Sequence, residues 1–310
     1  MRRPILLLLL LLGLAACADP GATPDSARSP ASSSALTAAP TSTVVGDAAR
    51  LIAAGDIAAC EVEGDSATAA LVASLGDDPT VATLGDHVYP SGTRENYAEC
   101  YDPVWGAWLD RTRPTMGNHD AEVDGGAAYH AYFGDRAGSP GAAWYSYELG
   151  DWHVVVLDSN CELIDCGAGS AQYEWLVADL AASEAKCTLA YQHHPRFSSG
   201  LHGDYEPVAL LWEVLTEAGV DVLLAGHDHM YERFAPQTPD RVADPGGIRQ
   251  FTVGTGGRGI REAVRLAANS ELIIDDAFGV LELTFHADAY DWRFLTVDGA
   301  EADAGTGACH

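Results

Sequence analysis

"VDVLLAGHDHMYER", residues 220–233, joins an apolar run to a motif that carries two histidines two positions apart. The run Val220–Ala225 is short and interrupted by a single Asp, which is typical of a buried strand. In α/β folds, ligands gather in the crevice just beyond the carboxyl ends of such strands. The stretch therefore predicts a strand whose end presents His227 and His229 to a ligand.

The same arrangement recurs along the chain. Five more segments combine an apolar run with polar, glycine-rich residues, and they span residues 50–58, 80–89, 152–160, 187–195 and 248–257. Amphipathic helical patterns fall at residues 65–75, 171–185 and 207–218, and residues 279–299 alternate as a half-exposed antiparallel hairpin does. Strands that alternate with helices predict an α/β protein of stacked sheets flanked by helices.

Ligand-type side chains stand at five places along the chain, four at the ends of these segments and one in "TMGNHD", residues 115–120. They are Asp56, Asp86 with Tyr89, Asn118 with His119, His193 with His194, and His227 with His229. A single Asp at a strand end is usually a turn or cap residue, and a lone histidine is more often structural. Chance is a poor explanation for five such positions in one chain. We therefore expect the side chains to converge if the strands share a sheet edge. The mixed set suits Fe, Zn or Mn better than Ca or Mg.

The chain is strongly acidic, with a formal net charge of −28 and a single lysine, Lys186. We therefore do not expect nucleic acid as a binding partner, because that function needs a basic surface. The charge would also repel an anionic substrate unless bound cations invert the local field.

The start of the chain has the features of an export signal. Arg2 and Arg3 precede an apolar run too short to span a bilayer comfortably, which predicts a signal peptide at residues 1–16. The ending "LAAC", residues 14–17, resembles the lipobox of bacterial lipoproteins and implies lipid attachment at Cys17. An ordinary cleaved signal with an incidental cysteine is the alternative.

A tether follows the signal. Residues 17–47 are rich in Ala, Ser, Thr and Pro and are expected to be disordered. Residues 48–310 are long enough for one domain with a substantial core. The expected location is the outer face of the bacterial cytoplasmic membrane or the periplasm, with the lipid anchor as the only membrane contact, rather than free secretion.

Six cysteines remain beyond Cys17, and an even count in an exported chain predicts disulfides. Their spacing lacks a paired zinc pattern. Cys161 and Cys166 form the favoured local bridge. The pairs Cys60–Cys100 and Cys187–Cys309 are two guesses among about 15 pairings, so the connectivity stays open.

Five blocks of sequence resemble a known family. They are "GDIA", "GDHVY", "GNHD", "QHHP" and "GHDHMYER", and in this order they are similar to the calcineurin-like metallophosphoesterases, most of all the purple acid phosphatase branch. The tyrosine of the second block and the "YER" of the last are marks of that branch. The resemblance covers about residues 50–295. It implies a four-layer α/β/β/α sandwich of two mixed sheets flanked by helices, with 48–310 as one catalytic domain.

The resemblance also implies two metal ions. The first, Fe(III), would be held by Asp56, Asp86, Tyr89 and His229, and the second, Zn, Mn or Fe(II), by Asp86, Asn118, His193 and His227. Many relatives have Asp-x-His in the first block, whereas position 58 here is Ala, so Tyr89 would supply the missing ligand. His193 is preferred to His194 because the family's ligand stands two residues before the proline.

Two such ions would polarise a phosphoryl group and bind a hydroxide nucleophile, so no protein nucleophile is needed. His119 is the first candidate for the general acid, with Asp120 positioned to orient it. An alternative role for His119 is to fix Asn118 or to bind phosphate. His202 and His194 are the next candidates for the acid.

Two further features near these blocks have weaker interpretations. Arg196 is a candidate contact to phosphate oxygens or, equally, a surface ion-pair residue. "GTGGRG", residues 254–259, lacks the lysine and hydroxyl of a phosphate-binding P-loop. It is better explained as a glycine-rich turn close to the site.

The favoured function is an enzyme that hydrolyses phosphomonoesters of small molecules, in the manner of acid phosphatases. A phosphodiesterase or nucleotidase on the same site is the first alternative. A non-catalytic lipoprotein that binds metal or phosphate is an alternative of another class.

Overall fold

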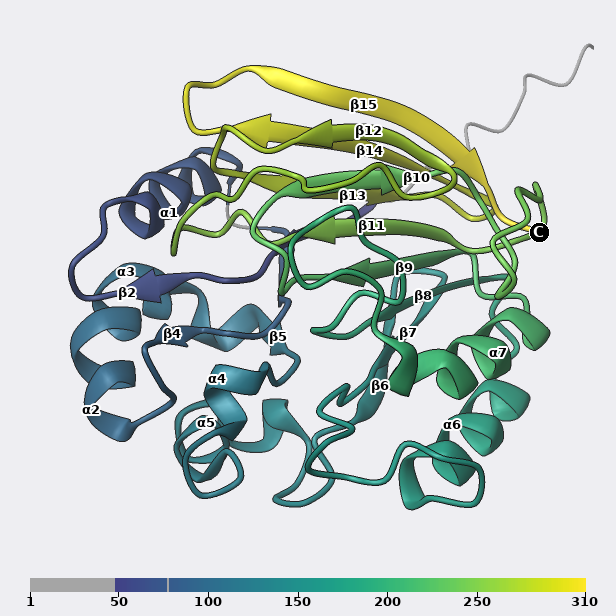
Figure 1. The fold of residues 1–310 in the computed structure, drawn as a ribbon, viewed down its shortest axis with the longest axis horizontal. Helices are drawn as coiled ribbons and strands as arrows, with labels where there is room; N and C mark the ends of the chain where they lie inside the picture. Colours follow the sequence, from purple (N-terminus) through teal and green to yellow (C-terminus); the bar gives the residue numbers. More distant parts are fainter. Residues whose placement is uncertain (1–47, 77) are drawn as a thin grey trace, which may run out of the picture. The chain divides into compact units, whose positions relative to one another are not determined.

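The computed structural model describes residues 48–76 and 78–310, in which two sheets are stacked between helices (Figure 1). The predicted signal, Cys17 and the predicted tether lie outside these residues, so those assignments stay predictions.

The first sheet has six strands in the order β15-β14-β13-β1-β3-β5. They are β1 Ala49–Ala54, β3 Thr80–Thr83, β5 Thr112–Pro114, β13 Gly279–Phe285, β14 Ala289–Thr296 and β15 Glu301–Ala308. β1, β3 and β5 are parallel, whereas β13, β14 and β15 form an antiparallel meander that pairs with β1 through β13. The predicted hairpin is confirmed as β13 and β14.

The second sheet has seven strands in the order β12-β10-β11-β9-β8-β7-β6. They are β6 Tyr145–Leu149, β7 Trp152–Val156, β8 Cys187–Tyr191, β9 Val222–Ala225, β10 Tyr231–Phe234, β11 Arg249–Val253 and β12 Ser270–Ile274. β7, β8, β9 and β11 are parallel, and antiparallel strands complete both edges. β2 Ala58–Ala59 and β4 Val88–Tyr89 form a small separate pair.

Alternation along the strands explains the layering, because successive side chains of a strand point to opposite faces. In β9, Val222 and Leu224 are buried in the core between the two sheets, while Leu223 and Ala225 are buried on the opposite face. β1 alternates in the same way between the inner core and a third cluster on the outer face of the first sheet. Three apolar interfaces therefore separate four layers.

Helices form the two outer layers. On the first sheet they are α1 Gly64–Ser74, α2 Arg94–Asn96, a π-helical turn η1 Tyr97–Tyr101, α3 Asp102–Trp105, η2 Gly106–Arg111, α4 Asn118–Ala121, α5 Ala127–Phe133 and η3 Gly134–Ala137. On the second sheet they are α6 Ala171–Ala182, η4 Glu206–Val208 and α7 Ala209–Glu217, with α6 and α7 side by side (Figure 1). The predicted helices correspond to α1, α6 and α7, and the predicted four-layer fold class is confirmed.

A buried histidine fastens the edge of the second sheet to α6. His153 of β7 has Nδ1 2.7 Å from Glu148 Oε1 of β6 and Nε2 2.8 Å from Asp179 Oδ2 of α6. Burial lowers the pKa of His153, but the hydrogen bonds to the two carboxylates outweigh it and raise the pKa above its ordinary value. The protonated ring therefore holds three elements together.

Three disulfides are present: Cys60–Cys100, Cys161–Cys166 and Cys187–Cys309, with Cα–Cα separations of 4.7, 5.4 and 5.4 Å. The favoured local pair and both of the guessed pairings are thus found together. Among the helices of residues 48–76 and 78–310, none has the length and hydrophobicity needed to cross a membrane.

Candidate metal centre

The site lies where the carboxyl ends of strands from both sheets meet. Loops after β1 and β3 provide Asp56 and Asp86, and the helix α4, which follows β5, begins with Asn118. Loops after β8 and β9 provide His193 and His227. The strands do not share a single sheet edge, which was the condition given for convergence, because they belong to two sheets that pack face to face. Convergence follows instead from the packing of one sheet on the other.

One group of donor atoms surrounds the Tyr89 hydroxyl. The hydroxyl oxygen lies 2.8 Å from Asp56 Oδ1, 2.8 Å from Asp86 Oδ2 and 3.3 Å from His229 Nε2. His229 Nε2 is also 3.3 Å from Asp56 Oδ1. A single hydroxyl proton cannot serve both carboxylates at once. This group is therefore rich in lone pairs and fits a cation.

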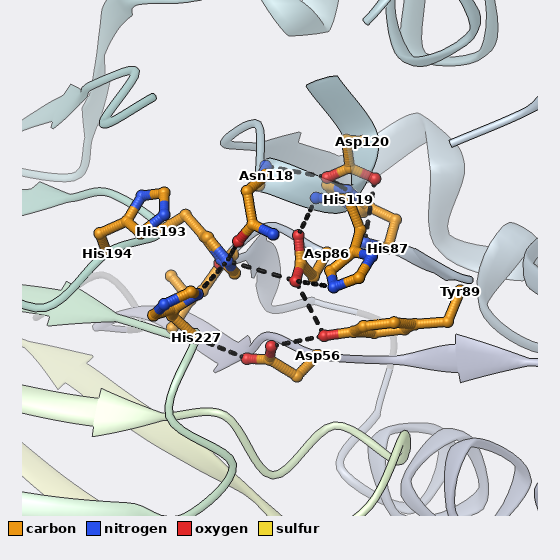
Figure 2. A network of polar contacts seen from close by, with 12 residues as sticks. Asp56, Asp86, His87, Tyr89, Asn118, His119, Asp120, His193, His194 and His227 are labelled. Carbon is orange, nitrogen blue, oxygen red and sulfur yellow. Dashed lines mark hydrogen bonds and ion pairs between the residues drawn. The ribbon is translucent and has the colours of Figure 1, made fainter. Parts of the chain in front are cut away.

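A second group surrounds His193. Its Nδ1 donates to the Leu84 carbonyl oxygen at 2.8 Å, which leaves the Nε2 lone pair of the neutral ring facing the site. That Nε2 lies 3.1 Å from Asn118 Oδ1, 3.2 Å from His227 Nδ1 and 3.4 Å from Asp86 Oδ2. Asp86 thus faces both groups, and Figure 2 shows it between Tyr89 on one side and His193 on the other.

The electrostatics of the cluster favour bound positive charge. Burial opposes ionisation of Asp56 and Asp86, but the facing histidines outweigh it and lower the pKa of both carboxyls. Burial lowers the pKa of His193, yet the Asp86 carboxylate raises it to about 9, while burial and neighbouring His193 lower the pKa of His227 to about 3. Burial and the two carboxylates raise the pKa of Tyr89 well above its ordinary value.

These pKa shifts indicate which protons a bound metal ion would have to displace. A proton on His193 and a metal ion compete for the same lone pair, so acid should weaken metal binding. A cation must also offset burial and two carboxylates before Tyr89 can act as a phenolate, which a trivalent ion does best. All seven residues predicted as ligands lie in this one cluster, and their donor set fits two cations that share Asp86.

One cluster in the described part of the chain that could hold a metal ion contains cysteines, but it is not a metal site. Cys187, Asp221 and Cys309 lie close enough to hold an ion. The two sulfurs are joined in a disulfide, however, and are not free thiolates.

His119 lies beside the cluster and is one-third exposed, at 34% for the side chain. Its Nδ1 donates to the Pro90 carbonyl oxygen at 2.6 Å, and its Nε2 lies 3.9 Å from Asp86 Oδ2. The ring packs on Tyr89 with centroids 4.4 Å apart. This geometry directs Nε2 towards the donor cluster.

The predicted pairing of His119 with Asp120 is wrong. Neighbouring residues on a helix point in different directions, and Asp120 is turned into the protein. Its carboxylate accepts from the Gly117 backbone N–H at 2.9 Å and from the Tyr97 hydroxyl at 2.7 Å, and it lies 2.8 Å from His87 Nδ1. Asp120 therefore fixes the start of α4 and leaves His119 to the Pro90 carbonyl.

His202 is held at the rim by an arginine from a distant loop. Arg261 Nη1 lies 2.9 Å from His202 Nε2, and the Arg261 backbone N–H donates to the His229 carbonyl oxygen at 2.9 Å. The His202 ring lies 4.3 Å from that of His227. Burial and the Arg261 charge lower the pKa of His202, although Asp228 acts the other way. A ring that accepts a hydrogen bond from a guanidinium is poorly suited to donate a proton.

His194 is more deeply buried than His202. Its Nδ1 lies 2.8 Å from Ser159 Oγ, and its ring stacks on Tyr205 at 4.4 Å with an interplanar angle of 19°. Burial and the neighbouring His193 lower the pKa of His194 well below its ordinary value. His194 therefore forms a neutral wall of the site.

Of the two roles considered for Arg196, the structure supports the ion pair. Its Nη1 lies 3.0 Å from Glu206 Oε1, and its guanidinium packs over the Phe197 ring at 4.7 Å. These partners use the guanidinium away from the donor cluster.

The glycine-rich turn at 254–259 does lie close to the site. The Arg258 backbone N–H donates to the Asp56 carbonyl oxygen at 2.9 Å, and the Arg258 guanidinium carbon lies 5.1 Å from the centre of the Tyr89 ring. Neither Arg258 nor Arg261 was singled out from the sequence. The three arginines within residues 258–265 of so acidic a chain were the available signal.

A cavity of about 610 Å³ opens beside the cluster. It is lined by Asn118, His119, Glu122, Asn160, Glu162, Leu163, His194, His202, Tyr205 and His227. Because two residues of the donor cluster, Asn118 and His227, form part of its wall, a molecule in this cavity would reach the candidate metal centre.

Residues 44–231, more than half of the chain, match the family model of the calcineurin-like phosphoesterases. The chain belongs to the calcineurin-like phosphoesterase family. The matched residues contain every block on which the resemblance was based, except for the end of the last, so that resemblance is confirmed.

Curated relatives of this family member are purple acid phosphatases. It is 32% identical over 195 residues to purple acid phosphatase 21 of Arabidopsis thaliana, covering 55% of this chain and 43% of that protein. It is 31% identical over 196 residues to purple acid phosphatase 22 of the same plant, covering 56% and 44%. The chain thus spans less than half the length of these relatives.

Solved structures share the fold. The purple acid phosphatase PPD1 from yellow lupin (Lupinus luteus) seeds superposes with a TM-score of 0.67 at 19% identity, covering 84% of this chain and 53% of that one. GAP50, the anchor in the inner membrane complex of Plasmodium, has a TM-score of 0.67 at 13% identity, covering 86% and 90%. At these identities the likeness concerns the fold alone.

Proposed function

We propose that this protein is a dinuclear metal-dependent phosphoesterase that hydrolyses phosphomonoesters of small molecules. The observation that carries the proposal is the convergence of seven donor side chains on two adjoining groups that share Asp86. The first cation, Fe(III), would be held by Asp56, Asp86, Tyr89 and His229. The second cation, Zn, Mn or Fe(II), would be held by Asp86, Asn118, His193 and His227.

Cations bound there would polarise the phosphoryl group and supply an activated water as nucleophile. The chain's own contribution begins with binding and orientation of the ester in the adjacent cavity, whose walls include the side chains of Asn118 and His227. His194 and Tyr205, stacked on each other, give that cavity a fixed face. A substrate held between these walls reacts without a search through orientations.

His119 is the residue we propose to protonate the leaving oxygen. The Pro90 carbonyl holds a proton on Nδ1, so only the imidazolium form carries a second proton on Nε2. Loss of the Nε2 proton returns the ring to the neutral tautomer that Pro90 already stabilises. Because His202 accepts from Arg261 and His194 is neutral, the geometry favours His119 for this step.

Export of the protein is supported by its three disulfides, which persist in oxidising compartments. We propose in addition that Cys17 carries a lipid that anchors the chain at the outer face of the cytoplasmic membrane. Incorporation of labelled palmitate by the wild-type chain, and its loss in Cys17→Ser, would support the anchor. Equal labelling of both would contradict it.

The deciding experiment is metal analysis of the purified protein together with turnover of p-nitrophenyl phosphate and bis(p-nitrophenyl) phosphate, with and without chelator. Hydrolysis of the monoester that chelation abolishes and metal restores is the expected result. Faster turnover of the diester would assign a phosphodiesterase or nucleotidase. No turnover of either ester by metal-loaded protein would overturn the proposal and leave a metal- or phosphate-binding lipoprotein.

A further inference from the structure

Positive charge lies near the candidate metal centre and the adjacent cavity. Arg258 lies over the Tyr89 ring, and Arg261 donates to His202 at the cavity rim. In the described part of the chain neither guanidinium forms an ion pair with a carboxylate. These two charges, together with cations on the donor cluster, would attract the phosphoryl group of a substrate.

The wall of the same cavity also carries negative charge. Glu122 and Glu162 both line it. The Glu122 side chain is 62% exposed, and its backbone N–H donates to the Asn118 carbonyl oxygen at 3.0 Å, which places it one turn from a proposed ligand. Glu162 lies in the short loop closed by the Cys161–Cys166 disulfide. Among the described residues neither carboxylate pairs with a lysine or arginine.

Apolar and aromatic surface lines the same cavity. Leu163 follows Glu162 in the disulfide loop, lines the cavity and is 62% exposed. Tyr205 stacks on His194 with its ring in the cavity wall. Glu162 lines the same cavity as Tyr205. An aromatic face beside carboxylates binds organic cations well.

These opposite charges set different requirements for the two ends of a substrate. A phosphoryl group is drawn to the metal centre and the arginines, whereas a further phosphate on the leaving group would meet two carboxylates. We infer that the preferred substrate is a phosphomonoester whose alcohol carries a positive charge, an aminoalkyl phosphate, selected by Glu122 and Glu162. The inference rests on the proposed phosphoesterase function and names the substrate class of that site.

The test compares choline phosphate with its neutral carbon isostere, 3,3-dimethylbutyl phosphate. The two esters differ in the charge of one atom, so the ratio of their kcat/KM values isolates the electrostatic preference. The wild-type protein is expected to prefer choline phosphate. In E122Q/E162Q the ratio should fall by about three- to tenfold, the range expected for two exposed charge pairs. Added salt should reduce the wild-type ratio towards that of the variant.

The matched control is E213Q/E217Q, which removes two exposed carboxylates from α7, away from the cavity. Its ratio should equal that of the wild type. An unchanged ratio in E122Q/E162Q, or an equal fall in the control, would overturn the inference while both esters are still hydrolysed. Failure of the metal-loaded protein to hydrolyse these esters and p-nitrophenyl phosphate would instead overturn the proposed function, and the inference with it.

Discussion

Replacement of His119 by Asn should slow the hydrolysis of phosphate esters according to how strongly the leaving oxygen needs a proton. Alkoxides are strong bases and leave well only when a general acid protonates them, whereas nitrophenolate leaves without one. His119 Nε2 lies 3.9 Å from Asp86 Oδ2 at the edge of the cavity, where a leaving group would emerge. The Asn amide retains a polar group of similar reach but cannot deliver a proton.

The expected size of the effect comes from the role and from the surroundings of the ring. General acid catalysis contributes about 10²- to 10⁴-fold, or about 3 to 5 kcal/mol of the barrier. The cost in folding free energy is smaller, because the side chain is 34% exposed. The substitution removes one hydrogen bond to Pro90 and the contact with the Tyr89 ring, each worth about 1 kcal/mol. The variant should therefore fold and retain its metal.

The assay measures kcat for glycerol phosphate and for p-nitrophenyl phosphate in wild type, His119→Asn and a control variant, His286→Asn. His286 is exposed in the turn between β13 and β14 and lies outside the cavity wall. His119→Asn should lose about 10²- to 10⁴-fold on the alkyl ester and less than about tenfold on the aryl ester. An equal loss on both esters would refute the proton-donor role and assign His119 to binding phosphate or fixing Asn118.

Three further predictions concern the metal centre and the fold. Tyr89→Phe should abolish the visible phenolate-to-iron band while leaving bound zinc or manganese detectable; a band of undiminished intensity in the variant would exclude Tyr89 as the iron ligand. The pKa of His153 is raised in the fold, so the charged ring stabilises below about pH 6.5 and the benefit is lost as the pH rises through the raised value. His153→Gln should therefore lower the free energy of unfolding more at about pH 5 than at about pH 9, and a constant loss in denaturant titrations would contradict this reasoning. Removal of the Cys187–Cys309 disulfide, which spans 122 residues, should cost about 5 kcal/mol in the same assay. A loss below about 1 kcal/mol would mean that the unfolded chain is held compact without it.

The parts of the fold that could be predicted from sequence are those in which burial produces a recognisable pattern of apolar residues. β7, β8, β9 and β11 are apolar runs because both of their faces are covered, and the hairpin of β13 and β14 alternates. β15, "EADAGTGA", shows no such pattern, and it forms because the exposed backbone edge of β14 pairs with it along its whole length. β6 and β12 were missed for a related reason, since they are the edge strands of the second sheet and residues at sheet edges take their conformation from a neighbour.

At the site, contacts between distant segments limit how much could be predicted from the sequence. Residue types and their position after strands gave a wider set of candidates that included His119 and His194, and the family resemblance was needed to select the seven ligands from it. The side-chain direction of Asp120 was not readable, because it depends on where α4 begins relative to β4. The Arg261–His202 hydrogen bond joins residues 59 positions apart in two irregular loops, for which no periodicity exists to be read.

The backbone conformation at the candidate ligands helps to explain why the motifs can be recognised in the sequence. Asp56, Asp86 and His227 have φ angles of 59°, 49° and 70°, a left-handed conformation that side chains rarely adopt. Such residues cost about 1 to 3 kcal/mol each and persist where surrounding contacts demand them. At His227 one such contact is visible, since its backbone N–H donates to Asp56 Oδ2 at 2.7 Å. In the described part of the chain, three of the six non-glycine residues with positive φ are therefore proposed metal ligands.

The glycines that precede these residues follow from the same crowding. A Cβ on Gly85 would lie 2.5 Å from His193 Nδ1, and one on Gly226 would lie 2.8 Å from Asp56 Oδ2. Each glycine in "GDH" and "GHDH" thus makes room for a candidate ligand contributed by another strand. The motifs therefore reflect two constraints. The first is the donor atom that a cation requires. The second is the absence of a side chain on glycine, which allows five segments from two sheets to reach the same small volume.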